Sequence, residues 1–321
     1  MPLSHAAAPG PSACSTASAR NGEPLAGTAP YARRWLAVEQ PGPWGSRALT
    51  ESHLPQAVAR ALAARAEAAG VRIALIRRPG RHAEHDPQAP RRVFLADTRP
   101  GRSTLWAWRT TDPATLLDLD FDIPGKPEHA GPAPLLVCTN SRRDECCALA
   151  GRALAGRLAQ DAAGGHAAAE AVWESDHLGG HRFAPTAVLL PTGYLYGRLD
   201  APAAHAILRE AAAGRVALDR CRGRSTWSRA GQAAELALRE QEREFAPDAV
   251  EVVGERSLDP LPGPGAPSPD THRYEVRLTS GGAAFRAEVA EAAAAEPRPE
   301  SCGKAPGRPL ELRVLRLEKD V

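Results

Sequence analysis

Two cysteines and two histidines have the residue types and the spacing that metal binding requires. Cys138 and Cys147 enclose eight residues, and His177 and His181 enclose three. Two thiolates and two imidazoles complete the four-ligand set of a soft or borderline metal centre. The sequence therefore predicts one metal centre built from two segments that lie far apart in the chain.

Cys146 stands directly before Cys147, and only one of the two can point into a given site. Consecutive residues on a helix project about 100° apart. Asp144 is a suitable helix cap, which makes Cys147 the third helical residue, where free backbone N–H groups can stabilise a thiolate or a cluster sulfur. We choose Cys147 as the ligand and expect Cys146 to face the core as a small apolar side chain. These residues alone leave the choice between the two open.

The two histidines are separated by Leu178, Gly179 and Gly180. The same spacing on a helix would place both rings on one face, but two adjacent glycines disfavour a helix. Glycines allow a tight loop that approaches a bulky inorganic group closely. We therefore expect the histidines to project from a loop.

The composition excludes several broad classes of protein. The chain has 321 residues, of which 43% are hydrophobic, so it can bury a real core. Its net charge of +2 argues against nucleic-acid binding that depends on bulk charge. No apolar stretch approaches the roughly 20 residues of a spanning helix, and the N-terminus lacks the pattern of a secretion signal. We expect a cytoplasmic protein with no membrane association, in which clustered cysteines bind metal or do chemistry.

The elements that must position the four side chains recur in one order along both halves of the chain. Each half follows the order strand, helix, strand, loop, hairpin, which is thioredoxin-like. In the first half the predicted strands are 35–38, 71–76, 93–96 and 104–108, with a helix at 52–69. In the second half they are 134–137, 169–174, 186–190 and 194–197, with a helix after Asp144. The predicted fold class is α/β, with two thioredoxin-like lobes and a small antiparallel β appendage of strands 274–278, 285–289 and 310–317.

Three segments resemble the sucrase/ferredoxin-like family: Cys138 to Cys147, His177-Leu-Gly-Gly-His-Arg-Phe-Ala-Pro185, and Gly193-Tyr-Leu-Tyr-Gly-Arg198. The resemblance covers about residues 14–239. It implies a thioredoxin-like ferredoxin whose [2Fe–2S] cluster is held by two cysteines with an eight-residue spacer and two histidines with a three-residue spacer. The resemblance favours Cys147 over Cys146. The four ligands that it implies are Cys138, Cys147, His177 and His181.

The order of predicted elements divides the chain into four parts. Residues 1–30 are a flexible N-terminus, and 31–130 are an N-terminal thioredoxin-like lobe without ligands. Residues 131–248 are the thioredoxin-like ferredoxin domain, and 249–321 are the β appendage. The first lobe carries His82 and His85, but no cysteine lies between residues 15 and 137, so it lacks a matching ligand set.

A cluster with these ligands predicts an electron-transfer protein. Two neutral histidines in place of two thiolates raise the reduction potential, and protonation of a ligating imidazole would couple electron transfer to proton transfer. We expect a redox partner such as a flavin-dependent reductase. Whether the protein is also an enzyme does not follow from the sequence.

Other functions compete with this interpretation. A structural Cys2His2 zinc site uses the same ligands, although its cysteines are usually two to four residues apart. Without any metal the protein would be an interaction scaffold. A thiol–disulfide oxidoreductase is less favoured because Cys-x-x-Cys is absent. A glycosidase is not expected, because nothing marks Asp118, Asp120 or Asp122 as an acid and a nucleophile.

The remaining cysteines and the basic run after residue 219 carry no predicted chemistry. Cys14 and Cys221 are expected to be ordinary thiols, and Cys302-Gly-Lys304 a structural turn. The arginines around Trp227 are expected to form a solvated surface: Arg220, Arg222, Arg224 and Arg229.

Overall fold

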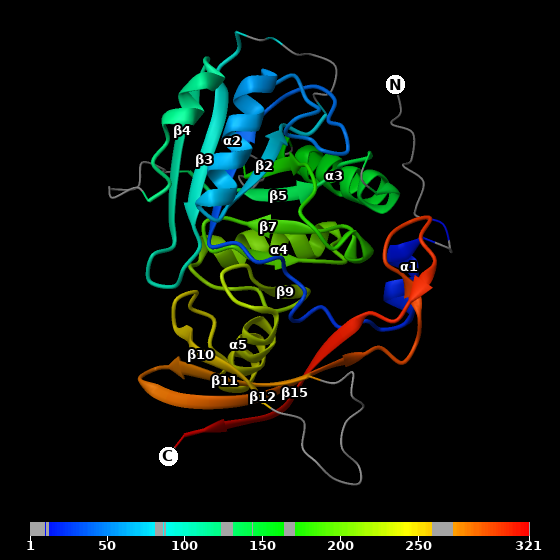
Figure 1. The fold of residues 1–321 in the computed structure, drawn as a ribbon, viewed down its shortest axis with the longest axis vertical. Coiled ribbons are helices and arrows are strands. Elements are labelled where there is room, and N and C mark those ends of the chain that lie inside the picture. The colour runs from blue at the N-terminus through cyan, green and yellow to red at the C-terminus, as the bar shows by residue number, and fades with distance from the viewer. Residues whose placement is uncertain are drawn as a thin grey trace.

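One nine-stranded mixed sheet runs through both halves of the chain in the computed structural model (Figure 1). The structure describes residues 10, 13–80, 86, 88–122, 131–142, 144–163, 171–258 and 272–320. The strands lie in the order β4-β3-β1-β2-β6-β5-β7-β8-β9. Their bounds are β1 Arg34–Glu39, β2 Val71–Arg77, β3 Arg91–Asp97, β4 Thr104–Thr110, β5 Leu135–Cys138, β6 Val172–Ser175, β7 Ala187–Leu189, β8 Tyr194–Tyr196 and β9 Cys221–Arg224.

The two halves of this sheet have the same internal order. In the first half β1 pairs parallel with β2 and antiparallel with β3, which pairs with β4. In the second half β5 pairs parallel with β6 and antiparallel with β7, which pairs with β8. The halves join where β2 pairs antiparallel with β6, with Ile76 opposite Ser175 and Arg77 opposite Glu174. The α/β class is confirmed, and the joining of both halves into one sheet was not predicted.

Helices connect the parallel strand pairs and cover the sheet. Helix α2 (Gln56–Ala68) links β1 to β2, and α3 (Arg152–Ala163) links β5 to β6 after a π-helical turn, Cys147–Gly151. Helices α4 (Ala201–Ala212) and α5 (Arg229–Glu242) follow β8 and β9. Asp200 and Ser228 cap α4 and α5 by accepting backbone N–H groups. Helix α2 was predicted from residue 52, but it begins after Pro55, whose side chain makes no capping hydrogen bond.

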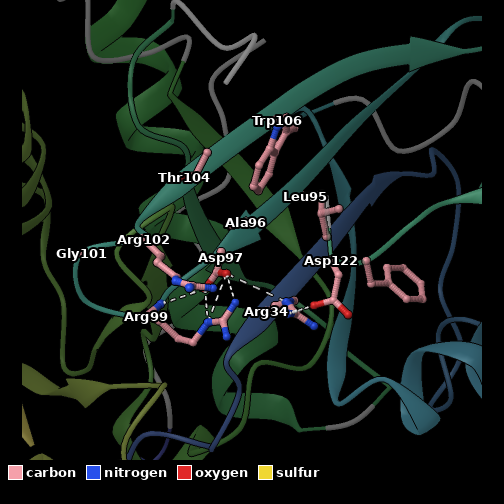
Figure 2. Close-up of a pocket in the computed structure, with 11 residues that line it drawn as sticks. Arg34, Leu95, Ala96, Asp97, Arg99, Gly101, Arg102, Thr104, Trp106 and Asp122 are labelled. Carbon is pink, nitrogen blue, oxygen red and sulfur yellow. Dashed lines mark hydrogen bonds and ion pairs between the residues drawn. The ribbon is translucent and has the colours of Figure 1, made fainter. Parts of the chain in front are cut away.

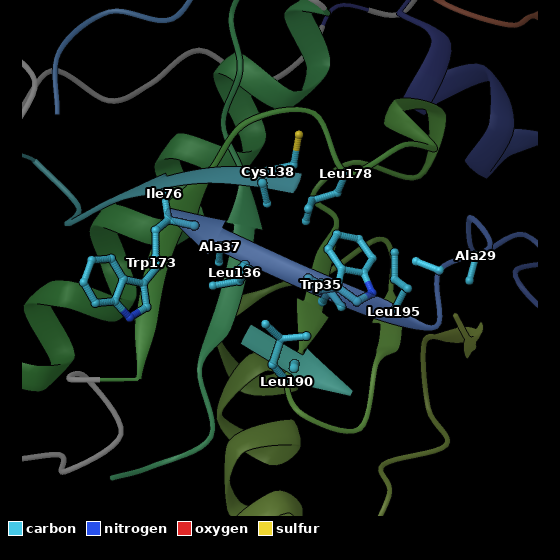
Figure 3. Packing of buried hydrophobic residues seen from close by; sticks show 14 of the residues in the cluster. Ala29, Trp35, Ala37, Ile76, Leu136, Cys138, Trp173, Leu178, Leu190 and Leu195 are labelled. Carbon is cyan, nitrogen blue, oxygen red and sulfur yellow. The ribbon is translucent and has the colours of Figure 1, made fainter. Parts of the chain in front are cut away.

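Alternate residues of the strands face opposite sides of the sheet and build separate cores. Leu36 and Val38 pack with α2 on one side. Trp35 and Ala37 face the other side, in a cluster that takes residues from both halves. Figure 3 shows Trp173 and Leu136 of the second half in this cluster, with Cys138 beside Leu178 at one end of it. The shared core fixes the second half against the first.

A separate antiparallel sheet forms the C-terminal part of the chain. It consists of β10 (Val250–Leu258), β11 (His272–Ser280), β12 (Ala283–Ala293) and β15 (Leu310–Lys319), and its apolar face packs on α5. The predicted appendage is confirmed, with β10 as a strand that was not predicted. Between β12 and β15, β13 (Arg298–Pro299) and β14 (Pro306–Gly307) form a short hairpin.

Helix α1 (Cys14–Arg20) lies within the segment predicted to be flexible. It packs against β13 and against the 3-10 turn His181–Phe183 (Figure 1). Its residues Cys14, Ser15 and Ser18 are buried, so packing against the rest of the chain orders this helix. The four predicted domain boundaries otherwise stay predictions.

Two arginines of the basic run are buried, so the prediction of a solvated surface is wrong for Arg222 and Arg224. Arg224 donates to the carbonyl oxygen atoms of Thr98 and Pro247 at 2.9 and 2.7 Å. Arg222 donates to the carbonyl oxygen of Gly179 at 2.9 Å. Buried guanidinium groups are tolerated because these carbonyl groups satisfy their N–H donors.

The described helices include none with the length and apolar character that crossing a membrane requires.

Candidate metal centre

The parallel pairing of β5 and β6 brings two predicted ligands to one edge of the sheet. Cys138 is the last residue of β5, and His177 follows β6 by two residues. The backbone N–H of Thr139 donates to the carbonyl oxygen of Ser175 at 2.9 Å, which continues the pairing to this edge. Parallel strands end on the same side, so the sequence order itself places the thiol and the imidazole close together.

The helix after β5 begins at Asp144, as predicted, and it directs Cys147 toward Cys138. The Asp144 carboxylate accepts the backbone N–H of Cys146 at 2.8 Å. The π-helical turn that begins at Cys147 packs against the end of β5 through Gly151, where a Cβ atom would lie 2.0 Å from the Cys138 carbonyl oxygen. Glycine thus permits the close approach, and single π-helical turns often occur at functional sites.

Cys138 and Cys147 are buried thiols that interact directly with each other. Hydrogen bonding from the Cys147 side chain lowers the pKa of Cys138 well below its ordinary value, with further contributions from His177 and the backbone N–H of Leu178. The same interaction, together with burial, raises the pKa of Cys147. The two opposite shifts reflect one hydrogen bond, in which the Cys147 thiol donates to the Cys138 sulfur.

Two guanidinium groups lie near these sulfurs, one from buried Arg222 and one from half-buried Arg72. Arg72 donates to the carbonyl oxygen of His177 at 3.3 Å and interacts electrostatically with Cys138. Arg222 interacts with Cys147, and burial lowers its pKa to about 9. The positive charges favour added negative charge at the two sulfurs.

The histidines project from a loop, as the adjacent glycines predict. Gly179 and Gly180 have φ angles of +89° and +76°, and a short 3-10 turn follows at His181–Phe183. The His177 and His181 rings lie 5.7 Å apart between centroids, with 34° between their planes. The left-handed backbone of the glycines thus turns both imidazoles toward the same region.

His181 has one bound and one free ring nitrogen. Its Nε2 lies 2.9 Å from the carbonyl oxygen of Glu300, in the β13–β14 hairpin. A carbonyl oxygen only accepts, so Nε2 carries the proton and Nδ1 keeps its lone pair. Nδ1 is buried and has no hydrogen-bond partner within the described parts of the chain. Burial lowers the pKa of this imidazole, which favours the neutral form that a metal requires.

A second group of side chains adjoins the four predicted ligands. Asp144 Oδ2 lies 3.7 Å from His181 Nε2. Asp144 also belongs to a group whose potential ligand atoms all lie within 4.8 Å of one another, namely Cys14, Asp144, Cys146 and Cys302. This group could hold a metal ion. Three of its members are buried, and Cys302 is partly exposed.

The sequence did not predict this second group. Cys14 and Cys302 were expected to be an ordinary thiol and part of a structural turn, and Cys146 a small apolar core residue. Asp144 lies 130 residues from Cys14 and 158 from Cys302, so no local spacing joins them. The one sequence signal was Cys146 beside Cys147, since a helix must point the two thiols in different directions.

The four predicted ligands lie at one edge but do not surround a single point. Cys138 interacts with Cys147 and His177, and His177 lies near His181. Across the residues that the structure describes, the second group alone has three or more ligand atoms within 4.8 Å of one another. The spacing of the predicted ligands is therefore wider than one ion needs.

Gly180→Ala should lower the free energy of unfolding more than Gly214→Ala does. Both glycines have left-handed backbones, with φ of +76° and +70°, which costs an alanine about 1–2 kcal/mol. At Gly180 the new Cβ would lie 2.2 Å from the Arg222 guanidinium, which hydrogen bonds hold in place, whereas Gly214 has open space. We expect an additional loss of about 1–3 kcal/mol of unfolding free energy for Gly180→Ala.

Thermal unfolding of the two variants measures this difference, with Gly214→Ala as the control for backbone strain. Equal losses of stability would show that Arg222 does not pack tightly on the loop from His177 to His181, here called the histidine loop.

A separate pocket of about 290 Å³ lies in the first half of the chain (Figure 2). Four of its charged groups form two pairs: Arg99 binds Asp97 at 2.9 Å, and Arg34 binds Asp122. The guanidinium groups of Arg34 and Arg99 are thus occupied by neighbouring carboxylates, and the pocket contains none of the four predicted ligands.

The chain has an α/β fold with a mixed sheet, and thiols and imidazoles lie at the ends of its parallel strands. These features define a candidate metal-binding protein. Residues 25–223 match the model of a family described as sucrase/ferredoxin-like, and the chain belongs to this family. The match includes all four predicted ligands, and it is shorter than the resemblance expected over residues 14–239. Comparisons with curated proteins and with solved structures gave no match.

Proposed function

We propose that the protein transfers single electrons through a [2Fe–2S] cluster held by Cys138, Cys147, His177 and His181. The observation that carries this proposal is the free Nδ1 of His181, which is buried without a partner while Nε2 faces the Glu300 carbonyl. Metal-ligating histidines commonly donate their other N–H to a backbone carbonyl, which fixes the ring and its tautomer. His181 has this arrangement.

The wide spacing of the four donors supports a cluster over a single zinc ion. Four ligands of one zinc ion converge on one centre at about 2.0–2.3 Å. A [2Fe–2S] cluster has two irons, so the two thiolates would hold one iron and the two imidazoles the other. The interacting cysteine pair and the adjacent histidine pair fit that division.

The chain's own residues would tune such a site. The cluster supplies a centre that accepts and releases one electron, and reduction adds one negative charge. Half-buried Arg72 and buried Arg222 would stabilise negative charge beside Cys138 and Cys147. Together with two neutral imidazole ligands, they favour a reduction potential above that of all-cysteine ferredoxins.

Electrons would enter and leave on the histidine side. The His181 side chain is 16% exposed, whereas Cys138 and Cys147 are each 1% exposed. We propose a flavin-dependent reductase as the electron donor. The coupling of electron transfer to proton transfer stays a prediction.

We also propose that the two halves are thioredoxin-like lobes of common design. The repeated order β2-β1-β3-β4 and β6-β5-β7-β8, with a parallel pair joined by a helix, supports this proposal. The first lobe, without a matching cysteine, serves as a scaffold for the second.

The iron and acid-labile sulfide content of the full chain, purified without oxygen, tests the proposed function. We expect two irons and two sulfides per chain and a reddish-brown colour. Zinc bound to these four residues, without sulfide, would replace electron transfer by a structural role.

A further inference from the structure

A second group of potential metal ligands lies beside the four predicted ligands, and three distant parts of the chain contribute to it. Cys14 comes from the start of α1, and Asp144 and Cys146 from the start of the helix after β5. Cys302 comes from the loop of the β13–β14 hairpin. An ion bound here would therefore connect the N-terminal helix, the ligand-bearing helix and the C-terminal hairpin.

The distances within this group suit one tetrahedral ion. At a metal–sulfur distance of about 2.3 Å, tetrahedral ligands lie about 3.8 Å apart. The Sγ atom of Cys146 lies 3.5 Å from that of Cys14 and 3.3 Å from that of Cys302, and the other sulfur pair is 3.7 Å apart. Asp144 oxygens lie 3.7–3.9 Å from Cys14 and Cys302.

Hydrogen bonds from neighbouring groups orient the donors of this group. The hydroxyl and the backbone N–H of Ser15 both hydrogen-bond to Cys146. The backbone N–H of Cys14 donates to Cys302. The Asp144 carboxylate accepts the N–H groups of Cys146 and Cys302 at 2.8 and 3.2 Å, which fixes its orientation. Such outer hydrogen bonds hold metal ligands in position.

The donor set selects among metals. Three thiolates favour Zn²⁺, Cu⁺ or iron–sulfur centres over hard cations such as Mg²⁺. The carboxylate oxygen is a harder donor that suits Zn²⁺ better than Cu⁺. An iron–sulfur cluster distributes its cysteines over several irons, whereas these donors surround one point. Four protein ligands leave no open position, which is typical of structural zinc.

We propose that Cys14, Cys146, Cys302 and Asp144 bind one structural zinc ion, which locks the β13–β14 hairpin over the histidine loop. Cys302 is two residues from Glu300, whose carbonyl oxygen holds His181 Nε2 at 2.9 Å. The buried Glu23 carboxylate anchors the same hairpin by accepting hydrogen bonds from Arg298 at 2.5 Å and also accepts one from Arg182 at 2.8 Å. The zinc ion thus completes a clamp, and its binding does not depend on whether the four predicted ligands hold a cluster.

The adjacent cysteines allow a crossed test on the full chain. Zinc and iron per chain are measured by mass spectrometry of the elements in the wild type and in Cys146→Ala, Cys147→Ala, Cys302→Ala and Cys221→Ala. Cys221 is a buried thiol of β9 that belongs to neither ligand set.

We expect one zinc per chain in the wild type, Cys147→Ala and Cys221→Ala, and at least a tenfold loss of zinc in Cys146→Ala and Cys302→Ala. A wild-type protein that neither contains nor takes up zinc overturns the proposal, as does iron in this site. Zinc loss in Cys147→Ala with zinc retained in Cys146→Ala also overturns it. Iron is counted separately, so failure of the zinc site and failure of the cluster are distinguishable.

Two measurements cover variants that fold poorly. X-ray absorption at the zinc edge of the wild type should show three sulfur neighbours and one oxygen, and a set that includes imidazole nitrogen would contradict the assignment. Hydrogen exchange of residues 298–307 should be slow in the wild type and at least tenfold faster in Cys302→Ala. Unchanged exchange after zinc loss, or a disulfide among the three cysteines of the purified protein, would refute the clamp.

Discussion

Cys138→Ala should abolish iron and sulfide binding, whereas Cys221→Ala should leave both unchanged. Cys138 is 1% exposed at the end of β5 and interacts with both Cys147 and His177. Its removal takes a thiolate from one iron and leaves no replacement donor, because a methyl group cannot bind metal. We expect the bound iron and the visible absorbance to fall by at least tenfold.

The control makes this result specific. Cys221 is also buried, and it is the first residue of β9. Burial raises its pKa to about 12, so it stays a protonated thiol. Both substitutions remove one buried thiol from the same sheet. Iron that persists in Cys138→Ala, or that disappears equally in Cys221→Ala, would exclude Cys138 as a ligand.

His181→Cys should keep the cluster and lower its reduction potential. The new cysteine would bind iron through a third thiolate, in place of the free Nδ1 lone pair of His181. This thiolate would add negative charge to the cluster. Centres with two histidine ligands have potentials about 250 mV or more above those of plant-type ferredoxins. One substitution should therefore lower the potential by roughly 100 mV.

A redox titration followed by the visible spectrum measures this shift. His205→Cys is a suitable control, since His205 lies on α4 and pairs with Asp161 at 3.0 Å, away from the four ligands. An unchanged potential in His181→Cys would mean that His181 does not bind the cluster.

The sequence predicted the parts of the site that depend on local order. Cys138 ends a strand, His177 follows the parallel neighbour of that strand, and parallel strands end on one side. Gly179 and Gly180 predicted a loop because left-handed backbone angles favour glycine. Asp144 predicted the start of the helix because its side chain accepts a free N–H group.

Contacts between distant segments could not be predicted in the same way. No pattern in the chain indicates that Cys14 and Cys302 approach Cys146, because the C-terminal hairpin folds back over the N-terminal helix. Arg222 resembled a solvated arginine, yet its N–H groups find the carbonyl of Gly179 in the interior. The antiparallel joining of β2 to β6 likewise depends on a shared core, in which Phe94 meets Trp173 at 5.7 Å.

The electron paramagnetic resonance spectrum of the dithionite-reduced full chain tests the central claim most directly. A [2Fe–2S] cluster with two histidine ligands should give a rhombic signal whose average g value lies below that of an all-cysteine cluster. A signal with the higher average g value of all-cysteine ligation, or no signal from a protein that contains zinc in place of iron and sulfide, would contradict the account.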